Sequence, residues 1–117
     1  MSTRATIRFA TREEGVTFNE HPEKWNAQLY RHHDGYPEGL GVDIAEQAPM
    51  RVEIEHIDTV HGDVEYIYYI WQDHDKGMWI SIFKTNVWEE EDEECIFVGR
   101  PDKLIGKYKL NTNDDGL

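Results

Sequence analysis

The alternation of apolar and polar residues near the start of the chain predicts a half-buried β-strand over residues 3–10. Its apolar side holds Ala5, Ile7 and Phe9, and its polar side holds Arg4, Thr6 and Arg8. Residues 13–15 then have the composition of a tight turn, and residues 16–18 that of a short return strand. The pattern therefore predicts a β-hairpin at the amino end.

The next segments combine a strand, a turn and a helix. Residues 27–33 are predicted to form a strand that runs into Asp34-Gly35, a dipeptide typical of turns. Pro37 suits the first position of a helix, because the N–H it lacks would have no partner there. Three apolar residues then recur at every fourth position: Leu40, Ile44 and Ala48. This spacing predicts an amphipathic helix over residues 37–48 that ends before the following proline.

The most continuously apolar stretch, residues 63–71, predicts a central strand that is buried on both faces. We expect three of its aromatic residues to lie in the core or on the sheet: Tyr66, Tyr68 and Trp71. A polar turn follows, and residues 78–84 are predicted to pair back antiparallel to the central strand. This hairpin would supply much of the hydrophobic core.

The remaining segments predict shorter elements. Residues 51–57 fit both a strand and a helical stripe, and we favour the strand. Six consecutive acidic residues at 89–94 predict a solvated loop before a strand at 95–98. Residues 101–105 fit either a last helical turn or a loop, and the polar residues 111–117 form a tail that should fray.

Together these elements predict an α+β fold. We expect a mainly antiparallel sheet of about five to seven strands, with one amphipathic helix on a face. A chain of 117 residues with 38% hydrophobic side chains is the size of a single domain, which we place at residues 1–117.

Charge and composition narrow the classes of function. Twelve Lys and Arg stand against 24 Asp and Glu, for a net charge of −12 at pH 7, which repels DNA, RNA and acidic membranes. No apolar run approaches the roughly 20 residues that span a bilayer, and the start of the chain has no signal core. A lone cysteine, Cys95, excludes an internal disulfide. We expect a cytoplasmic protein with no cofactor and no direct contact with nucleic acid or membrane.

Side chains that could bind a ligand or catalyse a reaction are concentrated in one segment. It is Tyr-Arg-His-His-Asp-Gly-Tyr-Pro-Glu-Gly at residues 30–39. Together with Ser-Thr-Arg-Ala-Thr-Ile at residues 2–7, it resembles a set of small, uncharacterised phage-borne and prokaryotic proteins. The likeness covers residues 1–41 and implies no activity. It implies a prokaryotic cell or a phage-infected host as the setting. It also implies that the first strand lies next to the strand that ends in the histidines.

The same segment favours recognition of a small anion or a nucleotide. A glycine turn before a helix start presents backbone N–H groups, and the arginine and histidines add further donors. The two tyrosines are close enough in sequence to sandwich a base. The candidate ligand-binding residues are Tyr30, Arg31, His32, His33, Asp34, Gly35 and Tyr36.

A plain corner between strand and helix explains many of the same residues. In that interpretation Asp34 accepts hydrogen bonds from turn amides and Gly35 supplies a positive φ, while the histidines bond buried carbonyls or tyrosine hydroxyls. The two interpretations differ in whether the basic side chains converge on one hollow. The side chains concerned are Arg4, Arg8, Arg31, His32 and His33.

Metal binding and catalysis have less support. Adjacent residues of a strand point to opposite faces, so His32 and His33 are not placed to hold one metal ion. No Gly-x-Ser-x-Gly motif is present, and an acidic run before Cys95 would raise the pKa of its thiol. An enzyme with either histidine as general base, oriented by Asp34, is kept as an alternative.

We therefore favour a non-catalytic binding or interaction protein. One alternative is an acidic surface that mimics nucleic acid and blocks a basic host protein. Another is a histidine-dependent enzyme that processes phosphoesters or nucleotides. The partners expected are a small anionic ligand or a basic protein. Unpaired strand edges also offer backbone for a homodimer, although charges near the strand ends discourage it.

Overall fold

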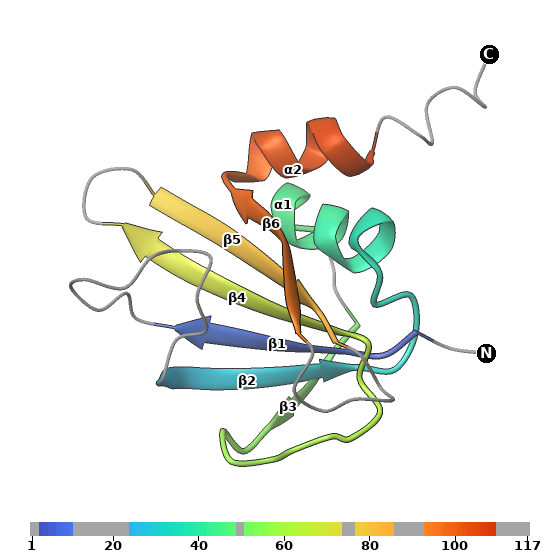
Figure 1. Ribbon diagram of the computed structural model, residues 1–117. Helices are drawn as coiled ribbons and strands as arrows, with labels where there is room; N and C mark the ends of the chain where they lie inside the picture. Colours follow the sequence, from blue (N-terminus) through green and yellow to red (C-terminus); the bar gives the residue numbers. More distant parts are fainter. Residues whose placement is uncertain (1–2, 11–23, 49–50, 74–76, 86–92, 110–117) are drawn as a thin grey trace.

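The computed structural model describes residues 3–10, 24–48, 51–73, 77–85 and 93–109. In these residues six strands form one sheet with short helices against it (Figure 1). The strands are β1 (Ala5–Ala10), β2 (Trp25–Arg31), β3 (Glu53–Glu55), β4 (Tyr66–Asp73), β5 (Gly77–Lys84) and β6 (Glu94–Gly99). The helical segments are η1 (Pro37–Gly41), which continues into α1 (Val42–Glu46), and α2 (Pro101–Tyr108).

The sheet is mixed, with the strand order β3-β2-β1-β4-β5-β6. Four of its five neighbouring pairs are antiparallel, and β1 and β4 are parallel, with Ile7 opposite Tyr68. The α+β class and the mainly antiparallel sheet are confirmed, whereas the one parallel pair was not predicted. It arises because the chain crosses over through η1, α1 and β3 before it enters β4.

β1 is buried on both faces, whereas its sequence pattern predicts one exposed face. Ala5 and Ile7 are fully buried on the helix side, and Thr6 on the other side is only 3% exposed. The reason is position, because β1 lies between β2 and β4 in the middle of the sheet. The return strand predicted at residues 16–18 and its turn lie outside the described residues.

β2 pairs antiparallel with β1, with Ala5 opposite Arg31. This is the adjacency that the resemblance implies for the two segments. The strand ends at Arg31, two residues earlier than predicted, since the chain bends from His32 onward.

β4 and β5 form the predicted antiparallel hairpin, in which Trp71 lies opposite Trp79. Alternate residues of β4 belong to different clusters: Tyr68 packs on the helix side and Trp71 on the opposite side. Tyr68 and Trp71 are 0% and 1% exposed, which confirms a strand buried on both faces. Residues 74–76 of the turn lie outside the described residues.

The helix predicted over residues 37–48 is shorter and less amphipathic. It begins at Pro37, is π-helical to Gly41 and α-helical to Glu46. Gln47 has a left-handed φ of 57° and ends it. Buried residues occur around the segment without a clean polar stripe: Pro37, Leu40, Gly41, Val42, Ile44 and Ala45. A second helix, α2, confirms the helical alternative for residues 101–105, so the described chain has two helical regions where one was expected.

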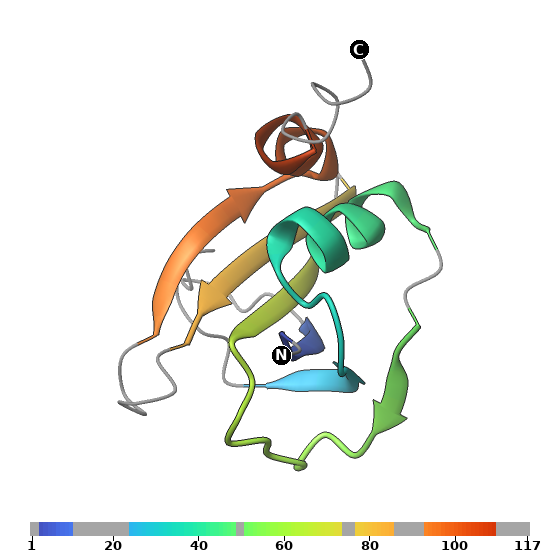
Figure 2. The ribbon, with the colours of Figure 1, turned by 90° about the vertical axis from the view of Figure 1, so that its right-hand side faces the viewer.

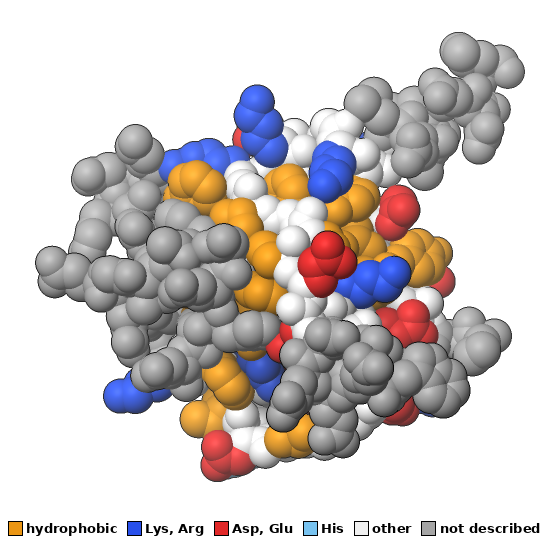
Figure 3. Space-filling view, viewed as in Figure 1, with side chains coloured by type: hydrophobic (Ala, Val, Ile, Leu, Met, Phe, Trp, Pro, Cys, Tyr) orange, Lys and Arg blue, Asp and Glu red, His pale blue; other side chains and the backbone are white. Residues whose placement is uncertain are grey.

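The helices cover one face of the sheet, which curves around α1 (Figure 2). The core on this side includes Leu40, Ile44, Tyr68, Ile80 and Leu104. The opposite face carries an aromatic cluster that includes Trp25, Tyr30, Tyr69, Trp71 and Trp79. In Figure 3, hydrophobic side chains lie in a band across the middle of the side facing the viewer, between charged ones.

The shorter predicted elements are partly confirmed. The strand favoured for residues 51–57 covers three residues, and the strand predicted at 95–98 extends over Glu94–Gly99. Most of the acidic run and the tail at 111–117 lie outside the described residues. Within the described part of the chain, no helix is long and apolar enough to cross a membrane.

Candidate functional site

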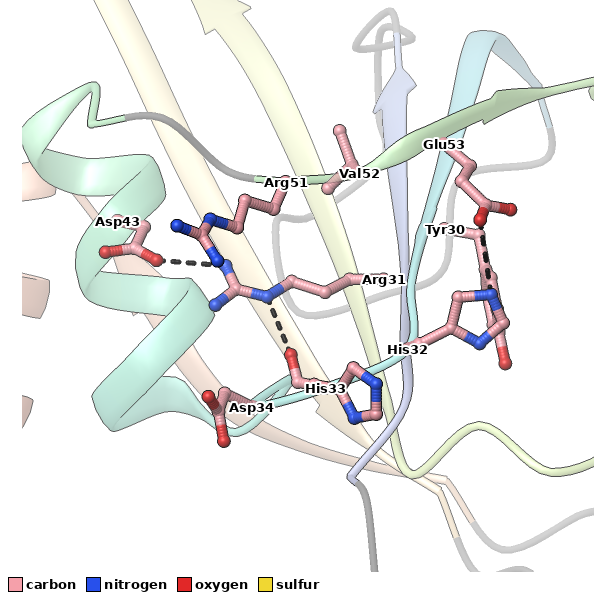
Figure 4. Close-up of a pocket in the computed structure, with 9 residues that line it drawn as sticks. All are labelled: Tyr30, Arg31, His32, His33, Asp34, Asp43, Arg51, Val52 and Glu53. Carbon is pink, nitrogen blue, oxygen red and sulfur yellow. Dashed lines mark hydrogen bonds and ion pairs between the residues drawn. The ribbon is translucent and has the colours of Figure 1, made fainter.

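A hollow of about 600 Å³ opens where β2 ends, between α1 and the start of β3 (Figure 4). Its lining comprises Tyr30, Arg31, His32, His33, Asp34, Asp43, Arg51, Val52 and Glu53. The predicted stretch from Tyr30 to Asp34 therefore lies at a real concavity. Gly35 and Tyr36 are not part of the lining.

Gly35 serves packing and does not present a free backbone donor. Its N–H donates to the Thr3 carbonyl at 2.9 Å, and a Cβ added there would lie 2.7 Å from the Cβ of Ala5. The left-handed residue of the turn is Asp34, with a φ of 56°, and not Gly35 as predicted. The glycine is required because the corner lies directly against β1.

The backbone N–H groups at the start of η1 are also used within the chain. The Gly39 N–H donates to the Tyr36 carbonyl at 3.0 Å, and the Leu40 N–H donates to the Asp34 carbonyl at 3.1 Å. The prediction that the glycine turn and helix start offer free amides is therefore wrong for these groups. A ligand in the hollow is not bound by the amides of Gly35, Gly39 and Leu40.

Arg31 is held in place by two acceptors. Its Nε donates to the His33 carbonyl at 2.7 Å, and its Nη1 donates to Oδ2 of Asp43 at 2.9 Å. The Arg31 side chain is 11% exposed and that of Asp43 is 31% exposed. The ion pair fastens the end of β2 to α1. A guanidinium has five N–H donors, so these two hydrogen bonds leave other donors of Arg31 for a ligand.

Arg51 approaches the same hollow from the chain before β3. Its side chain is exposed, and its backbone φ of 50° lies in the left-handed region that non-glycine residues seldom adopt. Figure 4 shows the Arg51 guanidinium pointing toward the Arg31 guanidinium and the Asp43 carboxylate. Within the described residues, Arg51 has neither a hydrogen bond nor an ion pair.

The histidines do not form the acid–base pair that the enzyme hypothesis requires with Asp34. His32 faces Glu53, with Nε2 3.4 Å from Oε1. The Asp34 carboxylate accepts a hydrogen bond from the Tyr36 hydroxyl at 3.1 Å, which raises the pKa of Tyr36. His33 is exposed at the rim, where its carbonyl binds Arg31.

The two tyrosines do not sandwich a base. Tyr30 is 4% exposed, and its ring is stacked on that of His61 at a centroid distance of 3.8 Å. The His32 ring packs edge-on against the Tyr30 ring, at a centroid distance of 4.7 Å, and burial raises the pKa of Tyr30. Tyr36 lies outside the hollow. Stacking of a base between Tyr30 and Tyr36 is therefore not available.

Arg4 and Arg8, whose position was to separate the pocket interpretation from the plain corner, do not line the hollow. Arg4 pairs with Asp63. Arg8 lies over the Trp25 ring at 4.0 Å and donates to Oε1 of Gln28 at 3.0 Å. Both stabilise the sheet, so the arginines of the hollow are Arg31 and Arg51.

The lining residues that local sequence patterns miss come from other elements: Asp43, Arg51, Val52 and Glu53. Arg51, Val52 and Glu53 reach the hollow because β3 pairs with β2, which sets Tyr30 opposite Glu53. Asp43 comes from α1, where it pairs with Arg31. Arg51 is the first residue of the strand predicted at 51–57, and nothing in the sequence alone indicated that it lies near Arg31.

Metal and thiol chemistry gain no support from the geometry. In the part of the chain that the structure describes, no three His, Cys, Asp or Glu side chains gather as a metal site. Burial raises the pKa of the Cys95 thiol, which keeps it protonated.

The fold and the hollow thus define a small α+β protein with two arginines at a surface concavity. No protein-family model matches the chain, and no match was found among the curated proteins or the solved structures. Function therefore has to be argued from the geometry.

Proposed function

We propose that this protein is a non-catalytic binding protein that holds a small anion, a phosphate or a carboxylate group, in the hollow at the end of β2. The proposal rests on Arg51, whose guanidinium points toward Arg31 and, among the described residues, has no protein partner. Two guanidiniums directed into one concavity favour an anion, because planar forks match carboxylate and phosphate oxygens.

The surroundings of Arg31 support tight positioning of such an anion. The Asp43 carboxylate and the His33 carbonyl fix its guanidinium before a ligand arrives, so little side-chain entropy is lost on binding. Asp43 is already paired with Arg31, whereas Arg51 has no hydrogen bond or ion pair among the described residues. Val52 supplies an apolar wall to the hollow. A volume of about 600 Å³ is in the range of sites for nucleotide-sized ligands.

Calorimetric titration tests the proposal with inorganic phosphate, acetate and adenosine monophosphate as separate ligands. We expect Arg51→Gln to weaken binding of the preferred anion by about ten-fold, which corresponds to one charge-assisted contact. The variant should fold normally, because the side chain is exposed. Lys84→Gln, at an exposed position of β5, makes the same change in net charge away from the hollow and serves as control.

The proposal is overturned if none of the three anions binds. It is also overturned if Arg51→Gln and Lys84→Gln weaken binding equally, since the effect would then reflect net charge alone.

A further inference from the structure

Exposed apolar side chains are concentrated in one short segment that begins in β3 and continues beyond it. Among the large hydrophobic residues exposed in the described chain, Ile54 is 87% exposed, Val60 82% and Ile57 38%. They fall within seven consecutive residues, and the remaining such residue, Tyr36, is distant from them in the sequence. Clustered exposed apolar side chains mark interaction surfaces more often than scattered ones do.

The backbone of this segment is anchored by side chains of β2. Trp25 Nε1 donates to the Ile57 carbonyl at 3.0 Å, and Gln28 Nε2 donates to the Thr59 carbonyl at 2.8 Å. Gln28 is only 1% exposed, so its bond lies inside the fold. The exposed apolar side chains therefore stand on a fixed backbone, which reduces the entropy lost when a partner binds.

A second anchor joins β3 to the end of the segment. Glu55 accepts a hydrogen bond from Gln28 Nε2 at 2.8 Å, and its other oxygen lies 2.6 Å from Nε2 of His61. The Glu55 side chain is 14% exposed and that of His61 is 24% exposed. This link closes residues 55–61 into a compact loop and holds the Glu55 carboxylate against Gln28 and His61.

β3 is the edge strand of the sheet. It pairs with β2, with Leu29 opposite Ile54, and the described residues place no strand on its outer side. The outer backbone groups of an edge strand are a template for one more strand.

Exposed carboxylates lie at this edge and just after it: Glu53, which faces His32, and Asp58, which faces His56. Between Arg51 and Lys76 the sequence contains no Lys or Arg. The side chain of Glu53 is 69% exposed and that of Asp58 is 84% exposed, so carboxylates flank the apolar residues on the surface. A partner with complementary charge is basic.

We propose that residues 53–60 dock an extended segment of another protein in which Lys or Arg alternates with apolar residues. The segment adds as a strand along β3. An apolar residue opposite Ile54 shares its face, and the basic neighbours of that residue lie on the face of Glu53 and near Asp58. This role is additional to anion binding and does not use Arg31 or Arg51.

Charge favours this occupant over a second copy of the chain. In an antiparallel pair of two β3 strands centred on Ile54, Glu53 of each copy would lie directly opposite Glu55 of the other. Like charges placed opposite each other in a sheet are destabilising. A basic strand replaces this repulsion by attraction.

Fluorescence anisotropy with a labelled Lys-Val-Lys-Val-Lys-Val-Lys peptide tests the proposal on the full chain. The same peptide with Glu for every Lys is the negative probe. We expect Ile54→Thr and Asp58→Lys each to weaken binding about five-fold or more, since each removes one cross-strand or charge contact. Glu94→Lys makes the same charge change as Asp58→Lys at the opposite edge of the sheet, on β6, and should change binding less than about two-fold.

Several results would overturn the proposal that residues 53–60 dock a basic strand. One is a failure of the lysine peptide to bind, and another is equal binding of the glutamate peptide. If Asp58→Lys and Glu94→Lys weaken binding of the lysine peptide equally, the attraction depends only on the net charge of the protein. If sedimentation shows a dimer of the wild type that Ile54→Thr abolishes, the edge strand pairs with a second copy of the chain instead. Phosphate binding by Ile54→Thr should stay unchanged, which separates this test from that of the hollow.

Discussion

Gly35 lies against β1 at the corner where β2 leads into η1, and its lack of a side chain makes this contact possible. Replacement by alanine would place a Cβ 2.7 Å from that of Ala5 and 3.0 Å from the Ala5 nitrogen. We expect Gly35→Ala to lower the free energy of unfolding in urea by about 1–3 kcal/mol, the usual cost of overpacking.

Gly106 provides the matched control for this substitution. It lies in α2, where an added Cβ meets nothing within 4 Å. Gly106→Ala should raise the free energy of unfolding by about 0.5–1 kcal/mol through helix propensity. Equal effects of the two substitutions would contradict the packing role of Gly35.

Tyr68 makes the stability of the fold sensitive to alkaline pH. Its hydroxyl donates to the Gly35 carbonyl at 2.6 Å, and burial raises its pKa well above the ordinary value of 10.0. The folded state therefore keeps this proton at a pH where the unfolded chain releases it. The stabilisation is complete below pH 10 and declines as the pH rises toward the folded pKa.

Tyr68→Phe isolates this contribution. At pH 7 we expect the variant to be less stable by about 1 kcal/mol, because a buried hydrogen bond is lost. Above pH 10 the difference from the wild type should shrink, since phenylalanine has no proton to release. Urea denaturation at pH 7 and pH 10.5 measures both values, and a constant difference would show that Tyr68 ionises equally in the two states.

Among the elements, the junction of β2 with α1 depends on the ion pair of Arg31 and Asp43. Because both side chains are at least two-thirds buried, we expect Asp43→Asn to cost about 1–2 kcal/mol of stability. A double-mutant cycle with Arg31→Gln should show a coupling energy of about 0.5 kcal/mol or more. Additive effects would mean that the two side chains stabilise the fold independently.

Strands with strong local patterns were predictable from the sequence. The continuous apolar and aromatic run of β4, followed by a polar turn and β5, is enough to specify a buried hairpin. The burial of Thr6 was not predictable, because it follows from the placement of β1 between β2 and β4. The early end of the helix at Gln47 was missed, since its left-handed backbone leaves no signature in apolar spacing.

The residues of the candidate site were also predictable only where the signal is local in the sequence. The stretch from Tyr30 to Asp34 was predictable because its residues are neighbours in the chain. Arg51 and Asp43 were not, since long-range strand pairing and helix packing bring them to the hollow. The expected roles of Gly35 and the helix amides failed because their hydrogen bonds go to Thr3, Asp34 and Tyr36 carbonyls.

For the whole molecule, the net charge of −12 opposes the compact state by self-repulsion. Sodium chloride screens this repulsion over about 10 Å at 0.1 M. We expect the thermal midpoint to rise by a few degrees between low salt and 0.3 M sodium chloride. A midpoint that falls over this range would show that attractive ion pairs outweigh the excess of carboxylates.

Anion binding by Arg51 and Arg31 in the hollow can be observed at the two guanidiniums themselves. Nuclear magnetic resonance titration with inorganic phosphate follows it through the Nε–H signals of the arginine side chains. We expect saturable shifts at Arg31 and Arg51 and at backbone amides of residues 31–34 and 51–53, with β6 unchanged. Shifts that spread evenly over all arginines without saturation, or an unmoved Arg51 signal, would contradict it.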